Sequence, residues 1–201
     1  GPSSQFLHDM AVTQGLWMGG SCPEVPADSD TSVDARPANT FVLAGPDGTV
    51  HRYRKLHPFT FGGEDRHVRP GDELVTVNID GIRISMFVCY DLRFPELYRA
   101  SAPAADVLLV PSAFTYTTGQ AHWDILLRAR AIENLAYVIA PAQGGVHDNG
   151  RRTWGHSLIA SPWGQVLDVR PEGAGAVMAE LDAAKLSQAR TQLPALTHRR
   201  L

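Results

Sequence analysis

The stretch IRISMFVCYDLRFPE, residues 82–96, decides how the rest of the chain is organised. Its first part is an apolar run rich in β-branched residues, which predicts a buried strand over residues 82–89. Pro95 suits the first turn of a helix, where an N–H group is not needed. The strand therefore delivers the Cys89 thiol to a turn beside a helix N-terminus, where positive partial charge favours the thiolate. Such a position suits a nucleophile.

Composition points to a globular protein with a sizeable core. The chain has 201 residues, of which 44% are hydrophobic and 19% are charged, and these values predict one domain over residues 1–201. The net charge of −3 comes without a basic stripe, which argues against a nucleic-acid partner. The apolar runs are strand-sized, which argues against a membrane partner. Two cysteines without a visible leader predict a cytoplasmic protein.

Strands and helices alternate along the chain, which predicts the α/β class. Helical spacing of apolar residues indicates helices over residues 6–14, 95–100 and 122–134, and a short helix that ends at Gln192. Apolar or alternating runs indicate strands over residues 16–21, 39–44, 50–53, 74–79, 82–89, 106–111, 137–140, 157–160, 166–169 and 176–181.

Four segments are predicted to be irregular. Residues 23–37 are rich in Pro, Asp and Ser and indicate a surface loop, so we do not expect Glu24 to be a catalytic base. Residues 60–72, 112–120 and 144–154 are predicted to shape a ligand pocket, since long loops in compact domains usually carry function. Phe114, Thr115 and Tyr116 follow the end of a strand, where α/β sheets bind ligands, and are predicted to line this pocket.

Taken singly, the candidate chemical groups are not decisive. A cysteine such as Cys89 often only packs in the core. Lys55 is equally consistent with a surface lysine, and Glu64 is equally consistent with an ordinary carboxylate of a loop. None of the eight histidines shows close metal-ligand spacing, so we predict no metal site. The set taken together is more informative than its members.

Three stretches carry a resemblance to a known family. They are Tyr53-Arg54-Lys55-Leu56-His57, Cys89-Tyr90-Asp91-Leu92-Arg93-Phe94-Pro95-Glu96 and Arg128-Ala129-Arg130-Ala131-Ile132-Glu133-Asn134. In order and spacing they resemble signature stretches of the nitrilase superfamily of carbon–nitrogen hydrolases. The resemblance covers nearly the whole chain and is strongest to the branch that holds deaminated-glutathione amidase and omega-amidase.

The resemblance implies a Glu–Lys–Cys site. Cys89 would be the nucleophile, Lys55 the cation that stabilises the oxyanion, and Glu64 an auxiliary glutamate that orients Lys55. The backbone N–H of Tyr90 would complete the oxyanion hole. The resemblance further implies a four-layer α-β-β-α sandwich that forms a homodimer or a higher homo-oligomer. Arg130 and Glu133 are expected to form a salt bridge along one helix.

Physical chemistry supports these roles. A thiol attacks an amide well only as the thiolate, and each preorganised donor to the oxyanion contributes about 3–4 kcal/mol. The leaving amine and the attacking water also require a general acid and base, normally a carboxylate. In the family, the general-base glutamate precedes the first helix seen here. The resemblance therefore implies a domain that lacks its first strands and helix, and it identifies no catalytic base among these residues.

The resemblance and this chemistry together predict hydrolysis of a small linear amide to a carboxylate and ammonia through a thioester on Cys89, with no metal and no organic cofactor. Three alternatives stay open. The chain is an N-carbamoyl amidase or a nitrilase of the same family, it is a non-catalytic truncated subunit, or it is a Cys–His hydrolase with His57 or His122 as base.

Overall fold

The computed structural model describes residues 1–25, 34–101 and 105–200. The chain forms two compact units, Gly1–Val75 and Thr76–Leu201. Each unit packs at least one helix on a β-sheet, in keeping with the α/β class that the alternation of strands and helices predicts.

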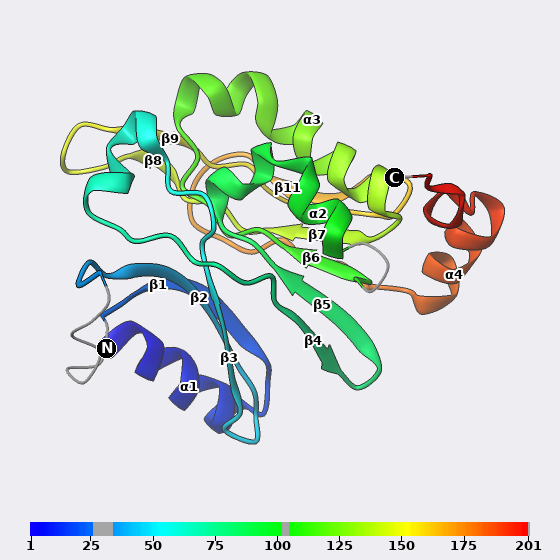
Figure 1. Cartoon of the computed structure of the whole chain (residues 1–201), viewed down its shortest axis with the longest axis horizontal. Coiled ribbons are helices and arrows are strands. Elements are labelled where there is room, and N and C mark those ends of the chain that lie inside the picture. Colours follow the sequence, from blue (N-terminus) through cyan, green and yellow to red (C-terminus); the bar gives the residue numbers. More distant parts are fainter. Residues whose placement is uncertain (26–33, 102–104, 201) are drawn as a thin grey trace. The chain divides into compact units, whose positions relative to one another are not determined.

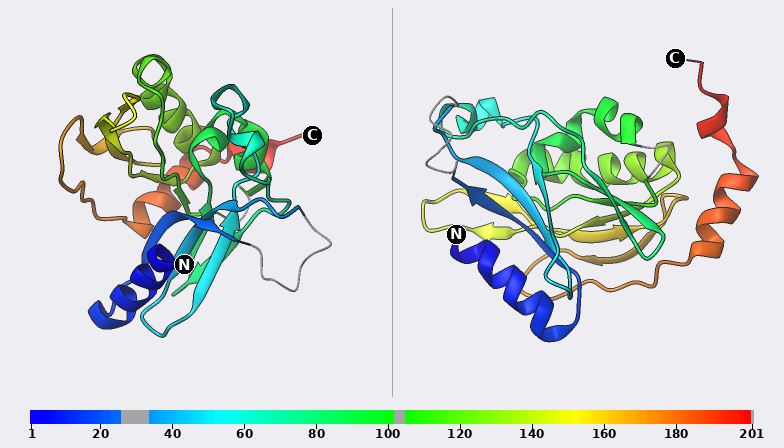
Figure 2. Two further views of the ribbon diagram at one scale, coloured as in Figure 1. Left: turned by 90° about the vertical axis from the view of Figure 1, so that its left-hand side faces the viewer. Right: turned by 60° about the horizontal axis from the view of Figure 1, so that its bottom comes forward.

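The first unit is a three-stranded antiparallel sheet covered by one helix. Helix α1 (Pro2–Gln14) packs against β1 (Met18–Glu24) and β2 (Ala38–Ala44), as Figures 1 and 2 show. Strand β2 is central and pairs with β1 and with β3 (Val50–Arg54). Nearly all the side chains of this central strand are buried.

The segment after β1 begins later than the composition predicts. The loop was expected to start at residue 23, but Pro23 and Glu24 still pair with β2, and residues 26–33 of the loop lie outside the described part of the chain. Glu24 stays in the sheet because its carboxylate accepts hydrogen bonds from the Thr40 hydroxyl at 2.9 Å and from Arg54 Nε at 2.8 Å. Glu24 is therefore a structural carboxylate of a strand, and its predicted position in a loop is wrong.

The second unit contains a six-stranded mixed sheet in the order β11-β10-β7-β6-β5-β4. Its strands are β4 (Thr76–Ile79), β5 (Ile82–Met86), β6 (Val107–Leu109), β7 (Tyr137–Ala140), β10 (Ser157–Ala160) and β11 (Val166–Arg170). The central strands β5, β6 and β7 run parallel. Helix α2 (Pro95–Ser101) lies between β5 and β6 in the chain, and α3 (Tyr116–Asn134) lies between β6 and β7. The carboxyl ends of the parallel strands therefore meet at one edge.

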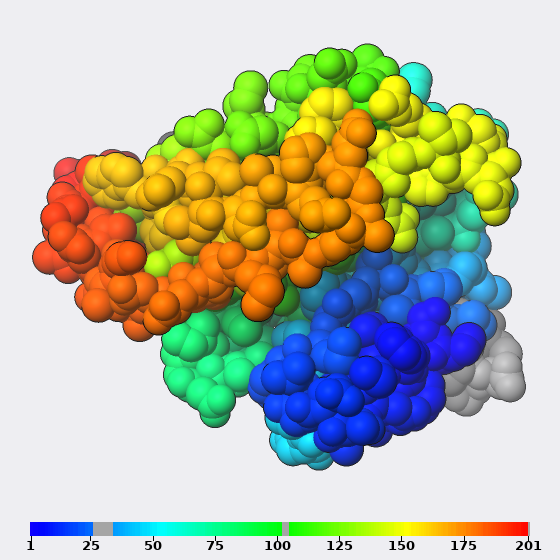
Figure 3. Space-filling view, turned by 180° about the vertical axis from the view of Figure 1, so that it is seen from behind, coloured from blue at the N-terminus to red at the C-terminus, as the bar shows by residue number. Residues whose placement is uncertain are grey.

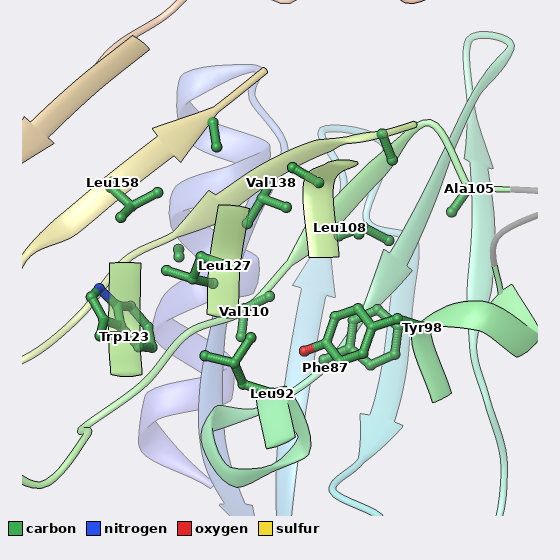
Figure 4. Close-up of a cluster of buried hydrophobic side chains, with 14 of the residues drawn as sticks. Phe87, Leu92, Tyr98, Ala105, Leu108, Val110, Trp123, Leu127, Val138 and Leu158 are labelled. Atoms are coloured by element: carbon green, nitrogen blue, oxygen red, sulfur yellow. The ribbon is translucent and has the colours of Figure 1, made fainter. Parts of the chain in front are cut away.

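The two faces of this sheet bury different residues. Leu108 of β6 and Val138 of β7 point into a core shared with α2 and α3, which Figure 4 shows around Trp123 and Leu127. The alternate residues, among them Tyr137, pack with Leu186 of α4 (Ala183–Gln192). This two-residue alternation is what the strand geometry requires.

Predictions for three segments of the second unit need correction. Helix α3 begins at Tyr116 and not at residue 122, because Gly119 lets the helix approach Trp154 so closely that an added Cβ would lie 2.3 Å from the Trp154 Cβ. The loop predicted over residues 144–154 contains a hairpin of β8 (Gly144–Val146) and β9 (Arg152–Trp154).

The third difference concerns residues 176–181, which form no strand. The N–H of Met178 donates to the Asp168 carboxylate at 2.8 Å, and this side-chain acceptor takes the place of a strand neighbour. Met178 is 81% exposed. Figure 3 shows this segment (orange), which follows β11, at the surface of the molecule.

Candidate active site

Cys89 opens a short 3-10 turn, η3 (Cys89–Arg93), at the edge where the parallel strands end. The predicted strand over residues 82–89 is too long, since β5 ends at Met86. The parallel pairing nevertheless continues, because the N–H of Phe87 donates to Leu109 at 2.9 Å and that of Cys89 donates to Pro111 at 3.0 Å. The backbone of Cys89 is thus fixed to the neighbouring chain at the point where it leaves the sheet.

The backbone of Cys89 is strained. Its φ is +50°, in the left-handed region that residues with a side chain rarely occupy. Such a conformation costs on the order of 1–3 kcal/mol and persists only where the surroundings hold it. Strain of this kind is concentrated at functional sites, where it aims a side chain.

Asp91 holds the turn from inside. The N–H of Val88 donates to Asp91 Oδ2 at 3.0 Å, and the N–H of Asp91 donates to the Val88 carbonyl at 3.1 Å. Asp91 is fully buried, so its carboxylate interacts with the turn in a low-dielectric setting. Asp91 therefore fixes the shape of the turn that Cys89 opens.

Cations and aromatic rings surround the turn. The Arg93 guanidinium lies 4.9 Å from the centre of the Phe114 ring and 5.9 Å from that of Tyr90. Arg93 Nη1 is 3.2 Å from Nδ1 of His122, an exposed residue at the surface of α3. Tyr90 and Phe114, both named from the sequence, therefore lie around one guanidinium. Phe114 is 3% exposed and also packs on Trp123, so its predicted contact with a ligand stays a prediction.

Thr115 and Tyr116 lie where the chain enters α3. Thr115 forms a bridge with Thr153 of β9, and its Oγ1 lies 2.5 Å from that of Thr118. The Arg152 guanidinium lies 3.7 Å from the centre of the Tyr116 ring, a close cation–π contact. The predicted pocket residues thus form two groups, Phe114 beside Arg93 and Tyr116 beside Arg152.

Lys55 directly follows β3 in the first unit and is only 2% exposed. Its N–H donates to the Asn39 carbonyl at 2.9 Å, and its carbonyl accepts from the N–H of Gly71 at 2.9 Å. Gly71 is required there, because an added Cβ would lie 2.2 Å from the Arg54 carbonyl oxygen. The interpretation of Lys55 as a surface lysine is therefore wrong, since its backbone is built into the unit and its side chain is buried.

Glu64 is the partner of this buried cation. Lys55 Nζ donates to Glu64 Oε2 at 2.5 Å, and the N–H of Phe59 donates to the same oxygen at 2.7 Å. Asn39 Nδ2 donates to Glu64 Oε1 at 3.0 Å. The predicted hydrogen bond between Lys55 and Glu64 is thus present. A lysine held in one position with its charge compensated is suited to stabilise an anion that forms nearby.

The carboxylates of the fold imply a loss of stability in acid. Burial would raise the pKa of Glu64 above its ordinary 4.5, but hydrogen bonds from Lys55 and Phe59 outweigh burial and lower it. The pKa of Asp106 is lowered in the same way by Arg83 and Arg190. Carboxyls with a depressed folded-state pKa stabilise the fold above the unfolded value and lose this contribution as the pH falls.

We therefore expect the free energy of unfolding to change little from pH 7 to about pH 5. It should decrease once the pH is below 4.5, the ordinary pKa of the Glu64 carboxyl in the unfolded chain. Urea denaturation at a series of pH values measures this. The Glu64→Gln variant should show a shallower fall than the parent chain. A free energy of unfolding that stays constant down to pH 3 would contradict the expectation.

Sequence reasoning did not assign Asn39, which contacts Lys55 and Glu64, or Arg130, which contacts the turn of Cys89. Asn39 was detectable, because the antiparallel register pairs Thr40 with Arg54 and so places Asn39 opposite Lys55. Arg130 was expected only to pair with Glu133, and that pair is present at 3.0 Å. Its other contacts cross to the Cys89 turn, and no short-range spacing in the sequence reveals them.

Comparisons with known proteins agree on one family. The profile of the carbon–nitrogen hydrolase family matches residues 1–191. The deaminated glutathione amidase of Yersinia enterocolitica is 38% identical over all of this chain and 72% of its own length. The human omega-amidase NIT2 is 36% identical over all of this chain and 74% of its own length.

A solved structure supports the same assignment. The protein XC1258 from Xanthomonas campestris, a CN-hydrolase superfamily protein with an arsenic adduct in its active site, superposes with a TM-score of 0.90. The two chains are 31% identical, and the match covers all of this chain and 76% of the other. Among the described residues, no helix is long and apolar enough to cross a membrane.

Proposed function

The chain belongs to the carbon–nitrogen hydrolase family and is an amidohydrolase, and from this premise we propose that it cleaves a small linear amide through a thioester on Cys89. The buried Lys55–Glu64 ion pair is the observation that carries this proposal. Lys55 is 2% exposed and lies beside a carboxylate, and burying this ion pair costs desolvation free energy. A buried cation is useful where an anion must be stabilised. We further propose that the two compact units together form a single hydrolase domain, since the family profile spans both.

The proposed reaction has two halves. The Cys89 thiolate attacks the amide carbon, and the oxyanion that forms is stabilised by Lys55 Nζ and by the N–H of Tyr90. The C–N bond then breaks, and ammonia leaves with the proton that the thiol gave up. Water next attacks the thioester and releases the carboxylate and the thiol. A carboxylate must carry the proton in both halves, and we assign this role to no residue of the chain.

The proposed substrates are small linear amides that carry a second polar group. One relative is named a deaminated glutathione amidase, and glutathione is a peptide that carries free carboxylates. Arg93 and Arg152, which lie on Phe114 and Tyr116, are cations suited to an acidic substrate. The Cys–His alternative has less support, because His122 is exposed and contacts Arg93, whereas Lys55 and Glu64 would have no role in it.

A panel of substrates tests the proposal. We expect ammonia without carbon dioxide from monoamides of dicarboxylic acids and from peptide-like amides. Release of ammonia together with carbon dioxide from carbamoyl compounds would favour the N-carbamoyl amidase, and turnover of nitriles would favour a nitrilase. No ammonia from any member of the panel would contradict the proposal and favour a non-catalytic subunit.

We also propose that the protein is a homodimer or a higher homo-oligomer in the cytoplasm. Ile125 and Ile132 of α3 are 66% and 46% exposed, and Trp163 in the β10–β11 turn is 60% exposed. An added Cβ at Gly164 of this turn would lie 2.5 Å from Cδ1 of Ile132, so helix and turn are in close contact. Exposed apolar groups that gather in this way support a protein–protein contact. Light scattering on the purified chain measures the number of copies.

A further inference from the structure

Arg130 is a buried arginine on α3 whose guanidinium contacts the turn that carries Cys89. It is 4% exposed, and both its Nε and its Nη2 donate to the carbonyl of Leu92, at 3.1 and 2.8 Å. The Leu92 side chain is fully buried in the core shown in Figure 4. The end of the turn is therefore fixed twice, by its side chain in the core and by its carbonyl on Arg130.

The guanidinium is itself held in place. Its Nη1 donates to Glu133 Oε1 at 3.0 Å, and its Cζ lies 5.2 Å from the centre of the Tyr98 ring. Tyr98 is fully buried and stacks on Phe87 with the ring centres 3.9 Å apart. A guanidinium that Glu133 and Tyr98 both hold presents two parallel donors to the Leu92 carbonyl in a single geometry.

This fixation matters because the turn is strained at its other end. Cys89 has a φ of +50° and is held there by the bond from its own N–H to Pro111 and by the Val88–Asp91 bonds. If Leu92 is released, the carboxyl side of the turn gains freedom, and the strained residue can relax toward an ordinary backbone conformation. The thiol would then point in a different direction.

We propose that Arg130 is a positioning residue for Cys89, which it serves by fixing the Leu92 carbonyl at the end of the nucleophile's turn. Arg130 acts through the backbone and needs no contact with the substrate. The effect on turnover rests on the proposed function. The effect on the reactivity of the Cys89 thiol does not, because alkylation needs no amide substrate.

Two substitutions test the inference. Arg130→Met keeps an apolar stem of similar length and removes all donors, whereas Arg130→Lys keeps the charge and one donor group. The matched control is Arg128→Met, which removes an arginine on the same helix that also donates to a backbone carbonyl, that of Gly164. For alkylation, all variants are made in a Cys22→Ala background, so that Cys89 is the single thiol of the chain.

For Arg130→Met we expect kcat to fall about ten- to a hundredfold with KM within about twofold, because a misplaced nucleophile slows chemistry more than binding. The rate of Cys89 alkylation by iodoacetamide should fall across the pH range, Arg130→Lys should be intermediate, and Arg128→Met should match the parent. A folded Arg130→Met with parental kcat and parental alkylation overturns the inference. If Arg130→Met does not fold, Arg130→Lys decides in the same way, and parental values for it also overturn the inference.

Two outcomes distinguish a failure of the proposed function from a failure of the positioning role. If Cys89→Ala retains amidase activity while Arg130→Met slows alkylation, the positioning role stands and the thioester mechanism falls. If Cys89→Ala is inactive and Arg130→Met is parental in both measurements, the mechanism stands and the positioning role falls.

Discussion

Replacing Cys89 by alanine is expected to reduce amide hydrolysis at least ~10³-fold and to leave the fold intact, because the covalent step has no other nucleophile. Cys89 is half-buried at the edge of the core, and its backbone bond to Pro111 does not depend on the sulfur. The loss should therefore appear in kcat, while the circular dichroism and the urea midpoint change little. Ammonia release with a monoamide substrate measures the activity.

The matched control for this variant is Cys22→Ala, which removes the other cysteine of the chain. Cys22 is 6% exposed in β1, and burial raises the pKa of its thiol, so it is a poor nucleophile. We expect Cys22→Ala to retain the parental kcat. A Cys89→Ala chain that retains more than about a tenth of the parental activity would show that Cys89 is not the group that attacks the amide.

Replacing Lys55 by methionine is the second large effect that we expect. Removing one oxyanion donor typically lowers kcat about 10²- to 10³-fold, and Lys55 is proposed to be such a donor. The same change leaves the Glu64 carboxylate without its cation in a site where little of it reaches water. We expect the free energy of unfolding to fall by on the order of 3 kcal/mol.

A double variant separates these two effects. In Lys55→Met/Glu64→Gln the buried position carries no charge, and the amide oxygen of glutamine still accepts from the N–H of Phe59. Most of the lost stability should return, whereas the activity should not. Activity that recovers together with stability would mean that Lys55 serves the fold and not the reaction.

Much of the fold could be predicted because it depends on local patterns. The strands at residues 137–140 and 157–160 agree with the structure, since their apolar runs are short and clearly bounded. The start of α3 was missed because residues 116–121 are polar and contain Gly119, which disfavours a helix in isolation. Its packing against Trp154 is a long-range contact that no local pattern contains. The nitrilase-type α/β fold that the resemblance implied is confirmed by the solved relative.

The candidate site also contains some features that local sequence patterns predict and others that they do not. Cys89 and Lys55 were predicted from signature stretches, and Glu64 was predicted from its position nine residues after Lys55, with which it forms a hydrogen bond. The left-handed conformation of Cys89 could not be predicted, because the apolar run up to residue 89 indicates a continuous strand. The contact between Arg130 and Leu92 joins residues 38 positions apart, so only the folded chain reveals it.

The central claim is that Cys89 carries the acyl group during turnover, and rapid quenching followed by mass spectrometry tests it most directly. Within the first turnovers on a monoamide, the peptide that contains Cys89 should gain the mass of the acyl group, with ammonia released in step. The gain should vanish on hydrolysis and be absent in Cys89→Ala. Steady ammonia release from a chain whose Cys89 peptide keeps its mass at every quench time, or that carries the acyl group elsewhere, would contradict the account.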